Sequence, residues 1–234
     1  MWLGKTKNAF EMFSTALVTL AAALLLWAQV ESRWLRPGGR PQPQDVTGLT
    51  INAGQVRHSK GAGAIALVEF TDYECPFCAQ HTRDTAPSID RTLVDTGRMR
   101  HVLFNFPLER LHPAARKASE AAECASRQGR FWEMHERLFN SGRLGDQQVL
   151  EIADALKLDQ PAFKKCLAGE AADAVTADIA EGRRLGVNAT PTFFVGTVQA
   201  DGSIQLAKRL SGALPYEDFQ KVVDAVNVIK LDHP

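Results

Sequence analysis

Cys75 and Cys78 are the residues best suited to chemistry in this 234-residue chain, because only two residues separate them and an apolar run precedes them. That run, residues 66–70, is typical of a buried strand that ends in a turn. Two cysteines at the start of a following helix would lie near its unpaired N–H groups, which favour a thiolate on the first. Cys75 is therefore the candidate nucleophile. Cys78 can attack a mixed disulfide on Cys75 and release the partner, so the pattern predicts thiol–disulfide exchange.

A close cysteine pair is also typical of half a structural zinc site. Cys124 and Cys166 do not form a second close pair, and the nearest further ligand is His81, three residues after Cys78. A non-enzymatic copper or zinc carrier that uses Cys75, Cys78 and His81 therefore stays open as an alternative. We interpret the other histidines as surface or partly buried side chains without a catalytic role, because their spacing gives no metal-ligand pattern: His101, His112 and His135.

Three segments, residues 68–78, 113–134 and 186–195, resemble the thioredoxin superfamily, and most closely its branch of DsbA-like extracytoplasmic thiol oxidoreductases. They contain, in turn, the strand with Cys-Pro-Phe-Cys, a helical stretch, and a Thr-Pro before an apolar strand. The resemblance covers roughly residues 60–230. It implies an α/β thioredoxin-like fold with a helical insertion at about residues 110–185, and no cofactor besides the redox-active Cys75–Cys78 disulfide.

The resemblance also implies the residues that hold a substrate. Thr190 and Pro191 would form a cis-proline loop against the cysteine pair, where the main chain of Thr190 pairs with an extended substrate. Pro76 and Phe77 would complete this substrate-binding set. Phe77 departs from the Pro-His dipeptide of DsbA itself and brings neither a hydrogen-bond donor nor a charge, so we expect a less depressed thiol pKa and a less oxidising disulfide.

Glu69 lies six positions before Cys75, where members of the superfamily have a buried acid. We expect burial to raise its pKa, so that it could exchange a proton with Cys78 through water. For Cys124 and Cys166 we favour a structural disulfide, as related proteins have in the insertion. Two buried free thiols, or a relay to the active cysteines, are the alternatives.

Periodicity and propensity give the expected elements. Phe131 and Trp132 are expected to pack beneath the helical cap. The predicted strands are residues 49–51, 65–70, 99–106, 192–195 and 203–207. The predicted helices run from residue 75 past 89, and over 114–125, 151–156, 161–167, 171–185 and 216–229.

The N-terminal segment differs from the rest, because residues 12–30 are uncharged and mostly apolar. Their length nearly matches a bilayer core, which favours a transmembrane anchor over a cleaved signal peptide. We therefore predict an anchor or signal at 1–31, a Pro- and Gly-rich flexible linker at 32–48 and the DsbA-like domain at 49–234. The favoured location is the inner membrane, single-pass, with the catalytic domain in the periplasm; a soluble periplasmic protein is the alternative.

The net charge of the chain indicates which kind of partner to expect. Lys and Arg number 27 and Asp and Glu number 27, so the net charge is zero and a nucleic-acid partner is not expected. The expected partners are unfolded or partly folded exported proteins and a membrane redox partner. The predicted function is an extracytoplasmic thiol–disulfide oxidoreductase, with oxidation of substrates as the favoured direction and a reductase or isomerase as the alternative.

Overall fold

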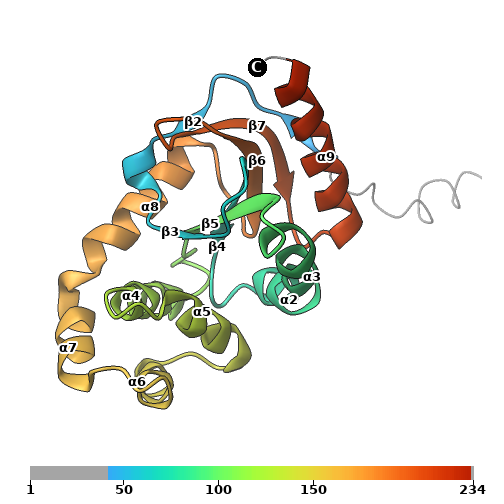
Figure 1. Ribbon diagram of the computed structural model, residues 1–234. Coiled ribbons are helices and arrows are strands. Elements are labelled where there is room, and N and C mark those ends of the chain that lie inside the picture. Colours follow the sequence, from blue (N-terminus) through green and yellow to red (C-terminus); the bar gives the residue numbers. More distant parts are fainter. Residues whose placement is uncertain (1–41, 233–234) are drawn as a thin grey trace, which may run out of the picture. The chain divides into compact units, whose positions relative to one another are not determined.

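The central strand of a seven-stranded mixed sheet leads into the cysteine pair (Figure 1). The strands follow the order β1-β7-β6-β4-β5-β3, with β2 also paired to β7, and only β4 and β5 are parallel. Their bounds are β1 Gln44–Asp45, β2 Thr50–Ile51, β3 His58–Lys60, β4 Ile65–Thr71, β5 Met99–Asn105, β6 Thr192–Val198 and β7 Ile204–Ser211. All seven residues of β4 are buried, as expected of a strand with neighbours on both edges.

Helices cover both faces of this sheet. Ile65 and Leu67 of β4 share a buried cluster with the helices α3 and α9, whereas Val68 and Phe70 share another with α8. The bounds are α2 Pro76–Asp84, α3 Ala86–Ile89, α4 Ala115–Ser126, α5 Phe131–Asn140, α6 Asp146–Ala155, α7 Gln160–Lys165, α8 Ala172–Arg184 and α9 Tyr216–Asp232. Shorter helical turns are η1 Ala53–Gln55, η2 Asp90–Val94 and η3 Cys166–Glu170.

The computed structural model describes residues 42–232. The predicted anchor or signal at 1–31 lies outside these residues, as does most of the predicted linker. Within the described part of the chain, no helix has the length and apolar character needed to cross a membrane.

The structure corrects two of the predicted boundaries. The linker was expected to reach residue 48, but Gln44 and Asp45 form β1 and pair with Arg209 and Lys208 of β7. An edge strand of two polar residues has no hydrophobic alternation, so periodicity cannot detect it. The helix expected from residue 75 past 89 is interrupted at Thr85, because Pro87 has no N–H for the helical ladder.

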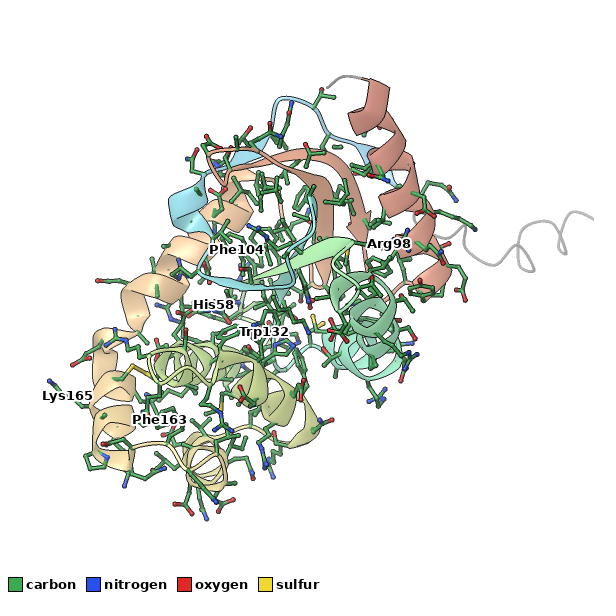
Figure 2. The ribbon with its side chains drawn as sticks, viewed as in Figure 1. His58, Arg98, Phe104, Trp132, Phe163 and Lys165 are labelled. Carbon is green, nitrogen blue, oxygen red and sulfur yellow. A yellow bond between two sulfur atoms is a disulfide. The ribbon has the colours of Figure 1, made fainter. Side chains whose placement is uncertain are left out.

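The predicted helical insertion is present, and α4 to α7 enclose a core of their own. Phe163 is fully buried inside it (Figure 2). Phe131 packs beneath the cap as expected, with its ring stacked on that of His58 at 3.6 Å between centroids. Cys124 of α4 and Cys166 of η3 form the disulfide that the resemblance implies, and it joins two segments 42 residues apart.

A buried polar network joins the insertion to the sheet. The side-chain amide of Asn105, at the end of β5, donates to Glu123 of α4 at 2.8 Å and to Asp178 of α8 at 3.2 Å. His58 bonds the same Glu123 oxygen at 2.8 Å, and Arg57 forms an ion pair with Asp178. Because both carboxylates are buried, each depends on these partners to remain in the interior.

The two carboxylates respond differently to this environment. Burial raises the pKa of Asp178 to about 6, helped by the charge of Glu123 and only partly offset by Arg57 and Asn105. Burial acts in the same direction on Glu123, but the hydrogen bond from His58 and the charge of Arg57 lower its pKa. Of the two carboxyls, that of Asp178 therefore has the higher pKa.

We predict that Asp178→Asn changes the pH dependence of stability. The pKa of Asp178 rises from 3.8 to about 6 on folding, so the folded state binds more protons between these values and stability falls as pH rises through that window. The variant should lack this fall in the free energy of unfolding. Between pH 4 and 7, the difference in stability between wild type and variant should therefore change by ~1–3 kcal/mol. Urea unfolding from pH 4 to 7 measures it. Asp173→Asn, exposed on the same helix, is the control. Parallel profiles for wild type and D178N would contradict the prediction.

Replacing Cys124 and Cys166 together by Ala should destabilise the domain, because the disulfide closes a long loop. We expect a loss of about 2–4 kcal/mol in the free energy of unfolding. Chemical denaturation measures this loss. In the Cys75→Ser/Cys78→Ser protein, Cys124–Cys166 is the remaining disulfide. Reducing it should lower the free energy of unfolding of that protein by the same amount. Unchanged stability of the double Ala variant would show that the bond has no structural role.

Candidate active site

Cys75 lies where β4 gives way to α2, immediately before the first residue of the helix. Its backbone N–H donates to the carbonyl oxygen of Asp72 at 3.1 Å, which closes the turn. Its thiol donates to the carbonyl oxygen of Thr190 at 3.3 Å. Pro76 occupies the first turn of α2, where a missing N–H costs nothing. The strand, the turn and the helix thus hold the sulfur of Cys75 beside Thr190.

The two cysteines, both free thiols here, differ in exposure and acidity. The pKa of Cys75 falls from 9.0 to about 5, chiefly through the hydrogen bond from Cys78, with help from the Thr190 hydroxyl and the N–H groups of Phe77 and Cys78, although burial acts to raise it. Cys78 is fully buried, and burial together with the neighbouring Cys75 raises its pKa well above 9.0. At neutral pH the site therefore holds a Cys75 thiolate next to a Cys78 thiol.

The other residues expected to bind substrate surround this sulfur. The Thr190–Pro191 peptide bond is cis, and Pro191 directly precedes β6, the neighbour of β4. The carbonyl oxygen of Pro191 accepts from the backbone N–H of Gly212 at 2.8 Å, which fixes the loop to the end of β7. Phe77 is 59% exposed, although it lies between two buried cysteines. Phe77 is thus available to an incoming chain.

Glu69 is buried on β4, but its expected pKa shift is wrong in sign. Burial acts to raise the pKa of Glu69, yet a 3.0 Å hydrogen bond with Nε2 of His101 and the nearby imidazoles lower it to about 2. One carboxylate oxygen of Glu69 and Nδ1 of His101 have no partner in the part of the chain that the structure describes. Glu69 is therefore an ionised carboxylate with spare capacity to accept a proton or a water.

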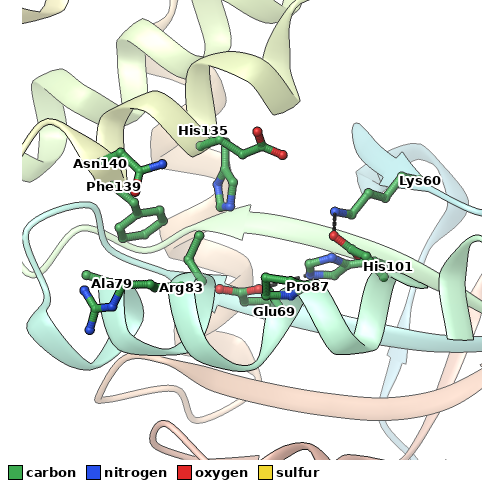
Figure 3. A pocket seen from close by; sticks show the side chains of 13 residues that line it. Lys60, Glu69, Ala79, Arg83, Pro87, His101, His135, Phe139 and Asn140 are labelled. Carbon is green, nitrogen blue, oxygen red and sulfur yellow. Dashed lines mark hydrogen bonds and ion pairs between the residues drawn. The ribbon is translucent and has the colours of Figure 1, made fainter. Parts of the chain in front are cut away.

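A cavity of about 380 Å³ lies beside this carboxylate (Figure 3). Ala79 of α2, Pro87 of α3 and Phe139 of α5 line its sides, and Glu69 and His101 lie at one wall. Ala79, the residue after Cys78 in α2, lines the cavity, whereas Cys78 itself does not.

The histidines are more buried than the sequence predicted. His81, His101 and His135 are each at most 5% exposed, because they pack against aromatic rings beneath α2 and α5. Burial lowers the pKa of His81 to about 4 and that of His135 to about 3, so both are neutral at pH 7. His81 packs against Phe193 and Phe219. Among the described residues, no three His, Cys, Asp or Glu side chains are grouped to hold a metal ion, including the suggested set with Cys75 and Cys78.

Two acidic residues before Cys75 have a role that the sequence interpretation missed. Asp72 is fully buried and accepts from the N–H of Leu108 at 2.7 Å and from Nδ1 of His112 at 2.8 Å. Glu74 accepts from the N–H of Ala114 at 2.6 Å. Both side chains tie the loop between β5 and α4 to the active-site turn. The one sign of this role in the sequence is that Asp72 and Glu74 lie within three residues of Cys75.

Comparisons with known proteins agree with this geometry. A family model described as thioredoxin matches residues 61–225. Among solved structures, α-DsbA1 of Wolbachia pipientis is 25% identical with a TM-score of 0.63 and covers 74% of this chain and 93% of its own. A thioredoxin-like oxidoreductase from Silicibacter pomeroyi DSS-3 is 26% identical with a TM-score of 0.59, covering 76% and 98%. Oxidised BdbD of Bacillus subtilis, at 21% identity, a TM-score of 0.63 and 78% and 98% coverage, shares the fold.

Relatives found by sequence are named as antiporters and not as oxidoreductases. The chain is 38% identical over 152 residues to the Na(+)/H(+) antiporter NhaA 1 of Salinispora arenicola, and 33% identical over 176 residues to the NhaA 1 of Mycolicibacterium vanbaalenii. These matches cover 64% and 72% of this chain. The chain spans only 22% and 27% of the length of those antiporters, so the similarity concerns one segment of each.

We predict that Cys75 titrates near pH 5 in the reduced protein. The thiolate absorbance at 240 nm should rise with a midpoint near that value, and Cys78→Ala should move the midpoint up because it removes the main hydrogen bond to the sulfur. Cys75→Ser, which should lack the transition, is the control. A wild-type midpoint near the ordinary value of 9.0, or no movement in C78A, would refute this electrostatic account.

Proposed function

The chain belongs to the thioredoxin family and is a DsbA-like member of it, and from this we propose that it exchanges disulfides with other proteins through Cys75 and Cys78. The observation that carries the proposal is the pairing of a stabilised Cys75 thiolate with a buried Cys78 thiol beside Thr190. This arrangement provides one sulfur that can leave or attack as a thiolate and, hydrogen-bonded to it, a second that stays protonated until it reacts.

In the oxidising direction, a substrate thiolate attacks the Cys75 sulfur of the Cys75–Cys78 disulfide. A bond forms between the substrate sulfur and Cys75, and Cys78 leaves as a thiolate and takes up a proton. A second substrate thiolate then attacks the first substrate sulfur and expels Cys75 as the stabilised thiolate. The substrate loses two electrons and gains a disulfide, while the cysteine pair becomes the dithiol.

The acidity of Cys75 favours this direction. A pKa lowered to about 5 stabilises the reduced protein above that pH, and this stabilisation is lost as pH falls through 5. Whatever stabilises the reduced form makes the disulfide more oxidising. The value lies between those of thioredoxin, about 7, and DsbA, about 3.5, which agrees in direction with the weaker effect expected of Phe77.

Glu69 serves the buried thiol in this proposal. When Cys78 attacks a mixed disulfide on Cys75, its proton must leave an interior site. Ionised Glu69, which lines the cavity, can take up that proton transiently through water, and His101 positions the carboxylate by its 3.0 Å hydrogen bond. Glu69 would then exchange a proton with Cys78 as the sequence suggested, but as a weaker base, because the pKa of its carboxyl is lowered and not raised.

The proposed chemistry also suggests where in the cell the domain works. The Cys124–Cys166 disulfide is compatible with an oxidising compartment, so we place the domain outside the cytoplasm. Residues 12–30 would tether it to the inner membrane facing the periplasm. Its substrates would be unfolded or partly folded exported proteins, and a membrane redox partner would restore the Cys75–Cys78 disulfide.

The reduction potential of the Cys75–Cys78 pair tests this function. We expect the full-length protein, equilibrated in glutathione buffers, to give a value nearer to about −120 mV, typical of strong oxidants, than to about −270 mV, typical of thioredoxin. Cys75→Ser is the control and should show no transition. A value near the lower figure would indicate a reductase, and failure to form the disulfide in any buffer would refute thiol exchange altogether.

A further inference from the structure

The loop at residues 107–114, between β5 and α4, presents an apolar side chain to solvent. Leu111 is 73% exposed in this loop, and Phe77 is 59% exposed between the active cysteines. They are the two large hydrophobic side chains that are exposed among those the structure describes. Phe77 lies between the two cysteines of the exchange site.

Sheet topology places this loop at the same edge as Cys75. β4 and β5 run parallel with Thr71 opposite Asn105, so both strands end at one edge of the sheet. The N–H of Phe106 then donates to the carbonyl oxygen of Thr71 at 2.7 Å, which continues the pairing to the start of the loop. β6 begins at this edge on the other side of β4. Cys75 therefore lies between Thr190 on one side and the 107–114 loop on the other.

The loop is held in place on that edge. Asp72 accepts hydrogen bonds from Leu108 and His112, and Glu74 accepts one from Ala114, so both ends are fixed to the turn before Cys75. At the tip, the N–H of Leu111 donates to the carbonyl oxygen of Leu108 at 2.8 Å. A leucine that remains mostly exposed on so constrained a loop gains no burial from the fold itself.

We infer that Leu111 is a substrate-contact residue that receives an apolar side chain of an extended, cysteine-containing polypeptide. The inference rests on the proposed function and adds a specificity determinant to it. A chain that pairs with Thr190 and places its cysteine at Cys75 continues across β4 toward the loop. Adjacent strands lie about 4.8 Å apart and an extended chain advances about 3.3 Å per residue, so the contacting side chain is about one or two residues from the substrate cysteine.

Oxidation of two-cysteine peptides by the full-length disulfide form tests this inference. One peptide carries Leu one and two residues to either side of its first cysteine, and a matched peptide carries Ser there. Each peptide loses two electrons and forms its disulfide as Cys75–Cys78 is reduced, and dithiothreitol is the small substrate without side chains. In wild type, we expect the Leu peptide to react about five-fold faster than the Ser peptide, the size of effect expected from covering one leucine.

Leu111→Ser should abolish that preference. The rate constant for the Leu peptide, divided by that for dithiothreitol, should be about five-fold lower in the variant than in wild type. Arg110→Ser, exposed next to it in the same loop, is the matched control and should keep the wild-type ratios. A preference for Leu that persists in L111S, or one absent from wild type while both peptides are oxidised, would overturn the inference and leave the proposed function standing. A wild-type protein that oxidises neither the peptides nor dithiothreitol would overturn both.

Discussion

The position of β4 between β5 and β6 is the constraint on which the rest of this protein depends. Because β4 and β5 are parallel and β6 is antiparallel to β4, the end of β4, the end of β5 and the start of β6 meet at one edge of the sheet. That edge brings together Cys75, Thr190 and the 107–114 loop, which are distant in sequence. The helical insertion between β5 and β6 can be long, because only its two ends need to reach this edge.

Burying β4 on both faces also forces polar groups to find partners inside the protein. Glu69 lies on the fully buried strand and is stabilised as an anion by His101. At the end of β5, Asn105 binds Asp178 and so links β5 to α8. An uncompensated charge in either place would cost several kcal/mol, so the first pair supports the alignment of β4 with β5 and the second holds α8 against the sheet. The polar interior thus specifies the geometry of the site.

The sequence predicted those parts of the fold that depend on local pattern. The apolar run before Cys75 identified β4, and the Ala-rich stretch identified α4, since burial and helix propensity leave periodic signals. The edge strand β3 was missed because three residues give no period. The pKa of Glu69 was predicted with the wrong sign because the sequence shows that an acid is buried but not that His101, 32 positions later, bonds it. The fixed 107–114 loop was missed for the same reason, since its bonds to Asp72 and Glu74 are tertiary.

The acidity of Cys75 shows why the dipeptide between the cysteines does not decide the redox chemistry alone. Phe77 offers the sulfur no side-chain donor, yet its backbone N–H contributes to a pKa of about 5. The largest contribution comes from Cys78, whose own burial keeps it protonated and therefore able to donate. The hydrogen bond from Cys78 and the N–H groups at the start of α2 thus supply most of the thiolate stabilisation, against the burial of Cys75, which raises the pKa. Because the Phe77 side chain is not needed to stabilise the thiolate, it can remain 59% exposed, as the proposed role in substrate contact requires.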